Sequence, residues 1–378
     1  MSDGRPHLLM TTDAVGGVWQ YSTDLARELA RQGWRTTLAV LGPAPGRSQR
    51  EGAASIPGLT LLDTAMPLDW MAHDSGAIAR AGRAIAALAR NLHADVIHLN
   101  SPALAAEVTF DVPVVAVTHS CTATWWAATQ AGPLPDELAW RPAIAAAGLA
   151  AADRVIAPSA SFAAATQRAY RLPQRPIVVH NGRAPLTRPS AAMHDFCFTA
   201  GRLWDKAKNI TTLDRAAGRL TVPFRAAGSL HGPNGEAAPP FEHLHSLGSV
   251  SEAEIARWLA SRPVFLSATH YEPFGLAVLE AAAAGCPLIL SDIPTFRELW
   301  DGAATFVAAN DATGFAAAAD AIVGDTGLRM ALGEAAQQRA ARYTPAAMAA
   351  GMATIYAGLG ISPRSSAPAT ARAGRAAA

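Results

Sequence analysis

Cysteine and lysine are both scarce in this chain of 378 residues. The three cysteines, Cys121, Cys197 and Cys286, form no Cys-x-x-Cys pair, so neither a zinc ribbon nor a thioredoxin-type redox site is indicated. An odd, scattered set of cysteines is typical of a reducing compartment. The cysteine pattern therefore favours a cytoplasmic protein.

Long apolar runs and excess charge are absent as well. The first residues, MSDGRPHLLM, contain no extended apolar region, and no stretch of about 20 apolar residues is free of charge. We therefore expect no signal peptide and no spanning helix, and a peripheral contact with the inner membrane face stays open. A net charge of +1 argues against a nucleic-acid partner.

Lysine is replaced by arginine almost everywhere. Of 31 basic residues only two are lysines, Lys206 and Lys208, and they lie beside Asn209. Lysine carries a compact, mobile ammonium group, whereas arginine carries a planar guanidinium group. The pair therefore indicates a site that needs an ammonium group, with chance as the alternative.

The order of apolar segments predicts parallel sheets. His7–Thr12 and Thr36–Leu41 read as strands on either side of a helix at Trp19–Gln32, which Gly33 would end. This is a βαβ unit. Further strands are expected at Asp95–Asn100, Pro113–His119, Arg154–Pro158, Ile177–His180, Phe196–Ala200, Phe224–Ala227, Val264–Ser267 and Leu288–Ser291.

Half the residues are hydrophobic, and the length favours two domains. Polar and proline-containing residues at 183–194 predict a linker between an N-terminal domain at 1–182 and a C-terminal domain at 195–344. A last helix is expected at 345–360, and residues 361–378 read as a disordered tail.

Ligands of open parallel sheets bind at the carboxyl ends of the strands. Gly16 and Gly17 follow the first predicted strand, where a backbone and a helix N-terminus can approach an anion. A tight structural turn is the alternative. Gly-x-Gly-x-x-Gly, Walker A, Gly-x-Ser-x-Gly and His-Glu-x-x-His motifs are all missing, which disfavours a nicotinamide enzyme.

Two further motifs follow strands in the second half. Arg202 and Lys208 can converge on a diphosphate. Glu272 precedes a predicted helix at Leu276–Ala284 that contains Glu280. Helix-start N–H groups near Phe274, Gly275 and Leu276 can hold phosphate or sugar oxygens.

The segment from Glu272 to Glu280 resembles the E-x₇-E signature of the retaining glycosyltransferase family 4. Gly16–Gly17, Asp95–His98, Thr118–His119, Ala152–Ser159 and Asn181–Gly182 resemble other marks of that family in the same order. The resemblance covers about Leu8 to Leu359. It implies the GT-B fold, an α/β architecture in which two Rossmann-like domains face a central cleft, and a last helix that crosses back to the first domain.

The resemblance also implies roles for individual residues. Arg202 and Lys208 would bind the donor diphosphate, Glu272 the transferred sugar, and Glu280 the ribose. Gly16, Gly17 and the backbone at Phe274, Gly275 and Leu276 would complete the donor site, and His119 would lie at the transferred sugar or the acceptor. The family lysine usually stands five residues after the arginine, so Lys206 is a rival to Lys208.

An Asp-x-Asp metal motif is absent, so charge on the leaving diphosphate would be met by Arg202, Lys208 and helix ends. The resemblance therefore implies a metal-independent, retaining hexosyltransferase that needs no cofactor besides its nucleotide-sugar donor. A sugar-nucleotide epimerase, a sugar phosphorylase and a non-catalytic nucleotide-sugar-binding protein are the alternatives.

The acceptor is open among glycans, lipid-linked molecules and small metabolites. Trp125 and Trp126 are candidates for lining its cleft. Loops are expected at Met66–Gly76 and Trp125–Leu138 on the acceptor side, and at Leu244–Val250 near the nucleotide base.

Overall fold

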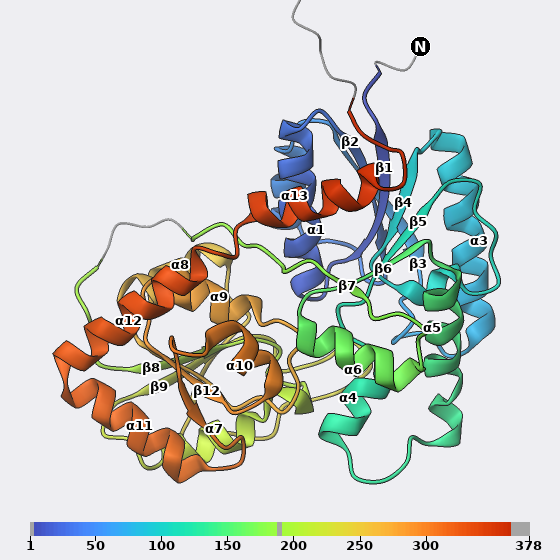
Figure 1. The fold of residues 1–378 in the computed structure, drawn as a ribbon. Coiled ribbons are helices and arrows are strands. Elements are labelled where there is room, and N and C mark those ends of the chain that lie inside the picture. The colour runs from blue at the N-terminus through green and yellow to red at the C-terminus, as the bar shows by residue number, and fades with distance from the viewer. Residues whose placement is uncertain (1–3, 187–190, 364–378) are drawn as a thin grey trace, which may run out of the picture.

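The computed structural model describes residues 4–186 and 191–363. Two α/β units follow one another along the chain and lie side by side (Figure 1). Part of the predicted linker, residues 187–190, and most of the predicted tail, residues 364–378, lie outside the described residues.

The first unit contains a seven-stranded parallel sheet in the order β3-β2-β1-β4-β5-β6-β7. Its inner strands are continuous apolar runs because helices cover both faces. The strands are β1 (His7–Asp13), β2 (Arg35–Leu41), β3 (Leu59–Met66), β4 (Val96–Leu99), β5 (Val114–Val117), β6 (Arg154–Ala157) and β7 (Ile177–Val178).

Six helices accompany this sheet. Asp74 and Ser159 cap two of them by accepting hydrogen bonds from Ala77 N and Phe162 N. The helices are α1 (Gly17–Arg31), α2 (Arg47–Ala54), α3 (Ser75–Leu92), α4 (Thr122–Thr129), α5 (Trp140–Ala151) and α6 (Ala160–Tyr170).

The second unit contains a six-stranded parallel sheet in the order β10-β9-β8-β11-β12-β13. The strands are β8 (Cys197–Ala200), β9 (Phe224–Ala227), β10 (His245–Gly248), β11 (Val264–Ser267), β12 (Leu288–Ser291) and β13 (Thr305–Val307). The helices are α7 (Ile210–Ala217), α8 (Glu252–Ala260), α9 (Leu276–Ala283), α10 (Pro294–Trp300), α11 (Ala312–Gly324) and α12 (Thr326–Ala340).

The strand order reverses direction beside β1 in the first sheet and beside β8 in the second. Such switch points open a crevice at the carboxyl ends of the strands. Gly16 and Gly17 follow β1, and Arg202 follows β8. Both motifs therefore lie where an open sheet binds its ligand.

The last helix, α13 (Pro345–Ala357), packs against the first sheet's α1 rather than on the second unit (Figure 1). Met348, Met352 and Tyr356 are buried there with Leu25. The chain crosses at Gly182, where a Cβ atom would lie 2.1 Å from the Thr344 carbonyl oxygen. Only glycine fits this close approach of two backbones.

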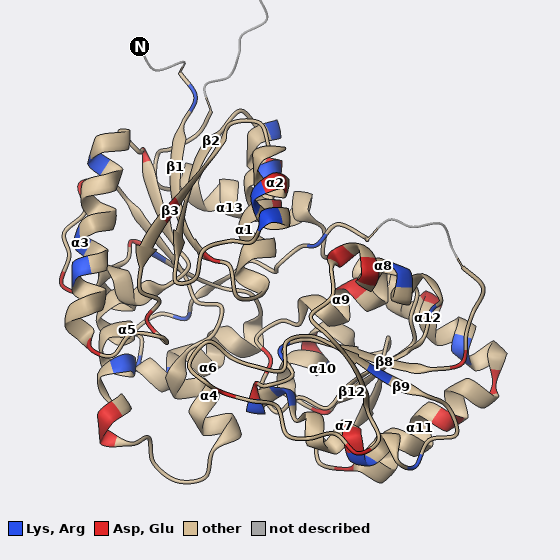
Figure 2. Cartoon of the chain, turned by 180° about the vertical axis from the view of Figure 1, so that it is seen from behind, with Lys and Arg blue, Asp and Glu red and all other residues tan. Residues whose placement is uncertain are grey.

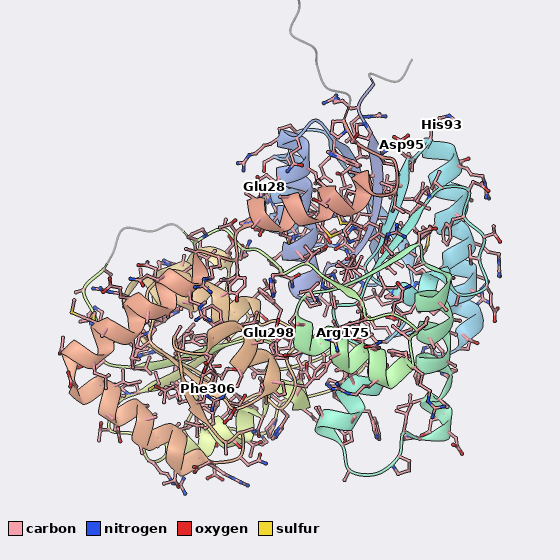
Figure 3. All side chains as sticks on the ribbon, viewed as in Figure 1. Glu28, His93, Asp95, Arg175, Glu298 and Phe306 are labelled. Carbon is pink, nitrogen blue, oxygen red and sulfur yellow. The ribbon has the colours of Figure 1, made fainter. Side chains whose placement is uncertain are left out.

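A second contact between the units joins α10 to the start of α6, near the Glu298 label in Figure 3. The Glu298 carboxylate accepts hydrogen bonds from Ala160 N at 2.7 Å and Ser161 N at 2.6 Å. Burial opposes ionisation, but hydrogen bonds from His180, Ser161 and the backbone lower the pKa of Glu298 to about 2.

Several elements differ from the sequence expectations. Strand β10 lies inside the segment expected as a loop at Leu244–Val250, and helix α4 takes in the first residues, 125–129, of the segment expected as a loop at Trp125–Leu138. Strands β3 and β13 and helices α2 and α3 were not predicted. The capping box at Ser251 and Glu254 is present, with Ser251 N donating to Glu254 Oε2 at 2.9 Å.

Basic and acidic residues are mixed over the outer helices of both units (Figure 2). None of the described helices combines the length and the apolar character needed to cross a bilayer.

Candidate functional site

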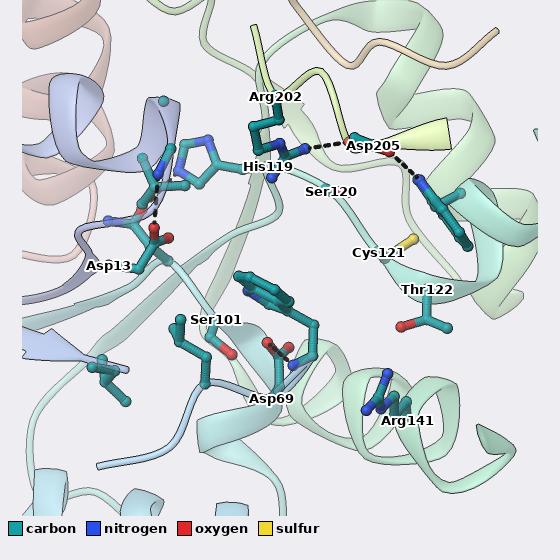
Figure 4. A pocket seen from close by; sticks show the side chains of 18 of the residues that line it. Asp13, Asp69, Ser101, His119, Ser120, Cys121, Thr122, Arg141, Arg202 and Asp205 are labelled. Atoms are coloured by element: carbon teal, nitrogen blue, oxygen red, sulfur yellow. Dashed lines mark hydrogen bonds and ion pairs between the residues drawn. The ribbon is translucent and has the colours of Figure 1, made fainter. Parts of the chain in front are cut away.

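A cavity of about 280 Å³ lies between the two units, and residues of both line it (Figure 4). The first unit contributes the ends of β1, β4 and β5 together with α4. The second contributes the loop after β8. The cavity therefore lies between the switch point beside β1 and the switch point beside β8.

Two of the predicted motifs, Gly16–Gly17 and Arg202, line this cavity, whereas Lys208, Glu272 and Leu276 do not. Leu276 nevertheless lies against Gly17. A Cβ atom on Gly17 would lie 3.2 Å from Leu276 Cδ1, and one on Gly16 would lie 3.8 Å from Arg202 Nη1. Gly16 is the N-cap of α1 and has no side chain to cap it. The first N–H groups of α1 therefore face the arginine and the α9 N-terminus of the other unit.

Asp13 closes β1 and lines the cavity. Its Oδ1 accepts hydrogen bonds from Val15 N at 2.8 Å and Gly16 N at 3.3 Å. Burial raises the pKa of Asp13, while these N–H groups and Arg202 oppose the rise. Asp13 thus fixes the glycine turn and brings a carboxyl group into the cavity.

Arg202 is held by Asp205, to which its Nη2 donates at 2.8 Å, and its guanidinium lies 5.4 Å from the centre of the Trp204 ring. The buried Asp205 also accepts a hydrogen bond from Trp125 Nε1 at 3.1 Å. Trp125 belongs to α4, so this bond joins the two units across the cavity.

The two lysines lie in different environments. Lys208 Nζ donates to Glu272 Oε2 at 2.6 Å, whereas Lys206 is exposed. The following Asn209 has a φ of 49° and bonds Ala268 O at 3.0 Å and Ala309 O at 2.8 Å. This left-handed residue anchors the turn that aims Lys208, and not Lys206, at the first glutamate of the motif.

The loop before α9 is held tightly. Ser159 Oγ of the first unit donates to Pro273 O at 2.7 Å. Phe274 is buried in the core, so only its backbone is available to a ligand. Gly275 has a φ of 95° as the N-cap, and a left-handed residue here turns the first N–H groups of α9 toward the cleft.

Glu280 does not line the cavity. Its Oε1 accepts a hydrogen bond from Arg183 Nε at 2.7 Å. The same guanidinium donates to Asp24 of α1 at 3.0 Å and to Glu252 of α8 at 2.5 Å. Burial raises the pKa of Glu280, and Arg183 opposes this rise.

His119 belongs to a buried polar network. Its Nε2 lies 2.8 Å from Asn100 Oδ1, which also lies 3.1 Å from His98 Nε2. His98 Nδ1 lies 2.7 Å from the Tyr356 hydroxyl of α13. Burial lowers the pKa of His119 to about 3 and that of His98 to about 4, so both rings are neutral at neutral pH.

Sequence reasoning missed the residues that hold this site together: Asp13, Asp24, Asp69, Asn100, Arg141, Arg183 and Asp205. Asp13 and Asn100 were detectable, because both are polar residues at the carboxyl ends of predicted strands. Arg183 carried no such signal, since its partners come from three separate segments. In the residues that the structure describes, no three His, Cys, Asp or Glu side chains are grouped so that they could hold a metal ion.

Comparison with known proteins identifies both units. Residues 15–184 match Glycosyltransferase Family 4, and residues 236–339 match Glycosyl transferases group 1. The phosphatidyl-myo-inositol mannosyltransferase of Mycolicibacterium smegmatis is 37% identical over 118 residues, which are 30% of this chain and 30% of that protein. The alignment thus spans under a third of this curated relative.

Solved structures share the whole architecture. Sucrose-phosphate synthase from Thermosynechococcus elongatus superposes with a TM-score of 0.78 at 19% identity, over 94% of this chain and 99% of that one. Anabaena HepE in complex with UDP has a TM-score of 0.66 at 16% identity, over 93% and 100% of the two chains. These likenesses establish the GT-B fold, and with both matched domains they place the chain among the family 4 and group 1 glycosyltransferases.

Proposed function

We propose that this protein is a retaining, metal-independent glycosyltransferase that moves a hexose from a nucleoside-diphosphate sugar to a hydroxyl acceptor. The contact between Lys208 and Glu272 at 2.6 Å carries the proposal. It joins the residue that would bind the diphosphate to the residue that would bind the transferred sugar. The membership in the family and the cavity between the units support the same reading.

The donor diphosphate would lie between Arg202, Lys208 and the N-termini of α1 and α9. Arginine offers a bidentate fork and lysine a point charge, and the first turns of α1 and α9 offer backbone N–H groups. These groups stabilise the negative charge that grows on the leaving nucleotide. We assign the diphosphate role to Lys208 and not to Lys206, because Lys206 is exposed.

The two glutamates would bind the hexose and the ribose of the donor. Glu272 would accept hydrogen bonds from hydroxyls of the transferred hexose, with Lys208 turning to the phosphate. Glu280 would hold the ribose through Oε2, because Arg183 takes only Oε1. HepE was solved in complex with UDP, so UDP is the first nucleotide to test.

His119 would act as a neutral hydrogen-bonding group, because a pKa of about 3 leaves it uncharged at neutral pH. It lines the cavity beside Arg202 (Figure 4). We propose attack on the same face of the sugar that the nucleotide leaves, with the departing phosphate taking the acceptor's proton. The anomeric configuration is then retained.

The test is transfer from nucleotide-sugars in the presence of EDTA, with the product anomer read by NMR. A retained anomer, formed by wild type and Lys206→Ala but not by Lys208→Ala, supports the proposal. An inverted anomer or a strict metal requirement overturns it. Turnover of the donor without an acceptor would point to an epimerase, and dependence on inorganic phosphate would point to a phosphorylase.

A further inference from the structure

The cavity has a second polar end, away from the proposed diphosphate site. Asp69 and Arg141 lie on the side opposite Arg202 and Asp205 (Figure 4). From this arrangement we infer that the acceptor is an uncharged, hydroxyl-rich ring, a neutral sugar or cyclic polyol, and that sugar phosphates and sugar acids are excluded. The inference rests on the glycosyl transfer proposed above.

The charges of the cavity disfavour an anionic acceptor. Asp13, Asp69 and Glu236 line it together with Arg141, while Arg202 is already paired with Asp205. Arg141 is thus the one cation of the described lining that the donor would not use, and two of the three carboxyl groups, Asp69 and Glu236, act on it directly. A phosphate or carboxylate there would meet like charges, which disfavour its binding.

Asp69 is available to hydroxyl groups. Its carboxylate accepts from Trp70 N at 2.9 Å, and the Ser101 hydroxyl lies against it. Burial raises the pKa of Asp69, which the nearby Ser101 hydroxyl, the Trp70 N–H and Arg141 oppose. A carboxylate has about four acceptor positions, so positions remain for sugar hydroxyls, which can take the place of water without adding charge.

Arg141 supplies the complementary donors. Its Nη2 donates to Ala72 O at 3.2 Å, and within residues 4–186 and 191–363 it makes no contact ion pair. Burial lowers the pKa of Arg141, while Asp69 and Glu236 oppose that change. A hydroxyl can accept from the guanidinium and donate to Asp69 at once, whereas an anion can only accept. The pair therefore fits a hydroxyl, or two neighbouring ones, better than an anion.

Four tryptophans supply flat apolar walls for a ring: Trp70, Trp125, Trp126 and Trp204. Trp125 is fixed by its bond to Asp205 at 3.1 Å, and Trp126 donates from Nε1 to Gly132 O at 3.2 Å. With their indole N–H groups occupied, these rings contribute mainly apolar surface to the cavity. Aromatic walls with a few converging polar groups are the usual composition of a small-molecule pocket, and sugar rings have apolar C–H faces that match such walls.

The inference is tested by measuring initial rates of transfer to a set of neutral acceptors and a set of anionic acceptors. Maltose, methyl glucoside, octyl glucoside and myo-inositol are the neutral probes, and glucose 6-phosphate and glucuronate are the anionic ones. We expect kcat/KM to be at least about 100-fold higher for the best neutral probe than for either anion. A preference for octyl glucoside over methyl glucoside would assign the ring to a lipid-linked acceptor. Equal or better use of an anion, or transfer to no neutral probe, overturns the inference.

The Asp69→Asn variant provides a second test of the inference. It should lower kcat/KM for the best neutral probe by about 10- to 100-fold, because a charged hydrogen bond is lost, and should narrow the ratio between neutral and anionic probes. Asp111→Asn, an exposed carboxylate outside this cavity, is the matched control. An unchanged ratio in Asp69→Asn contradicts the inference. Nucleotide binding without acceptor tests the proposed function separately, so the two can fail independently.

Discussion

Arg183 donates to Glu280 from Nε at 2.7 Å, and the same guanidinium reaches Asp24 of the first unit at 3.0 Å. The side chain of Arg183 is only 8% exposed. A residue between the two sheets thus fixes the second glutamate of the motif and ties it to α1. The proposed ribose contact is therefore coupled to the contact between the units.

Arg183→Met removes the cation and leaves Glu280 as a buried acid without its ion-pair partner, while Asp24 keeps only Arg27. Breaking one side of a buried ion pair costs about 3–5 kcal/mol, so urea denaturation should show a loss of this size, with weaker nucleotide binding. Arg47→Met is the control, because Arg47 pairs with Glu51 on an exposed helix face and such pairs contribute about 0–1 kcal/mol. Equal losses in the two variants would show that Arg183 has no special role.

Glu298 gives the contact between α10 and α6 a defined pH dependence. Its folded-state pKa of about 2 lies below its ordinary value of 4.5, so its contribution to stability is complete above about pH 4.5 and is lost as the pH falls through about 2. Because solvent screens this half-buried carboxyl, the contribution is roughly 1–2 kcal/mol. The difference in unfolding free energy between wild type and Glu298→Gln should have this size near pH 6 and shrink toward pH 2. A difference that does not change with pH contradicts the assignment.

Gly182 allows the chain to cross beneath α13. Gly182→Ala would place a Cβ atom 2.1 Å from Thr344 O, a clash with backbone that costs about 3 kcal/mol or more. Gly52→Ala is the matched control, since nothing lies within 4 Å of the added atom and alanine is favoured in the helix α2 by about 0.5–1 kcal/mol. Thermal unfolding should therefore shift in opposite directions. A tolerated Gly182→Ala would mean that the two backbones can separate without loss.

The polar network behind His119 should matter for activity as well as stability. Asn100→Ala leaves Nε2 of both His119 and His98 without their acceptor, and an unsatisfied buried group costs about 1–3 kcal/mol. We expect this loss in denaturation and a lower kcat, because His119 is no longer held at the cavity. Asn100→Asp keeps the acceptor oxygen and should recover part of both. Full activity in Asn100→Ala would show that catalysis does not depend on how His119 is held.

Much of this architecture was predictable because parallel strands buried on both faces are continuous apolar runs, as in β1 and β12. The elements that were missed lack that signal. Strand β3 lies at the sheet edge and is only partly buried, and α3 is rich in alanine and glycine. Short strands such as β13, with three residues, are set by their neighbours rather than by their own sequence.

The motif residues were predictable one by one, but their pairing was not. Sequence order indicated that Gly17 and Leu276 both lie at helix starts, whereas the 3.2 Å approach between them depends on how the two units pack. The same holds for Arg183, whose partners are more than 60 residues distant along the chain. The choice of Lys208 over Lys206 for contact with Glu272 depended on the left-handed Asn209.

The central claim is a metal-free diphosphate site built on Lys208. Its most direct test is thermal unfolding with UDP, GDP and ADP in excess EDTA, for wild type, Lys208→Ala and Lys206→Ala. A ligand at a hundred times its dissociation constant adds about 2.7 kcal/mol, and about 2–4 °C per kcal/mol is expected for domains of this size. The account predicts a clear shift with one nucleotide in wild type and Lys206→Ala, and its loss in Lys208→Ala. No shift with any nucleotide, or an undiminished shift in Lys208→Ala, would contradict it.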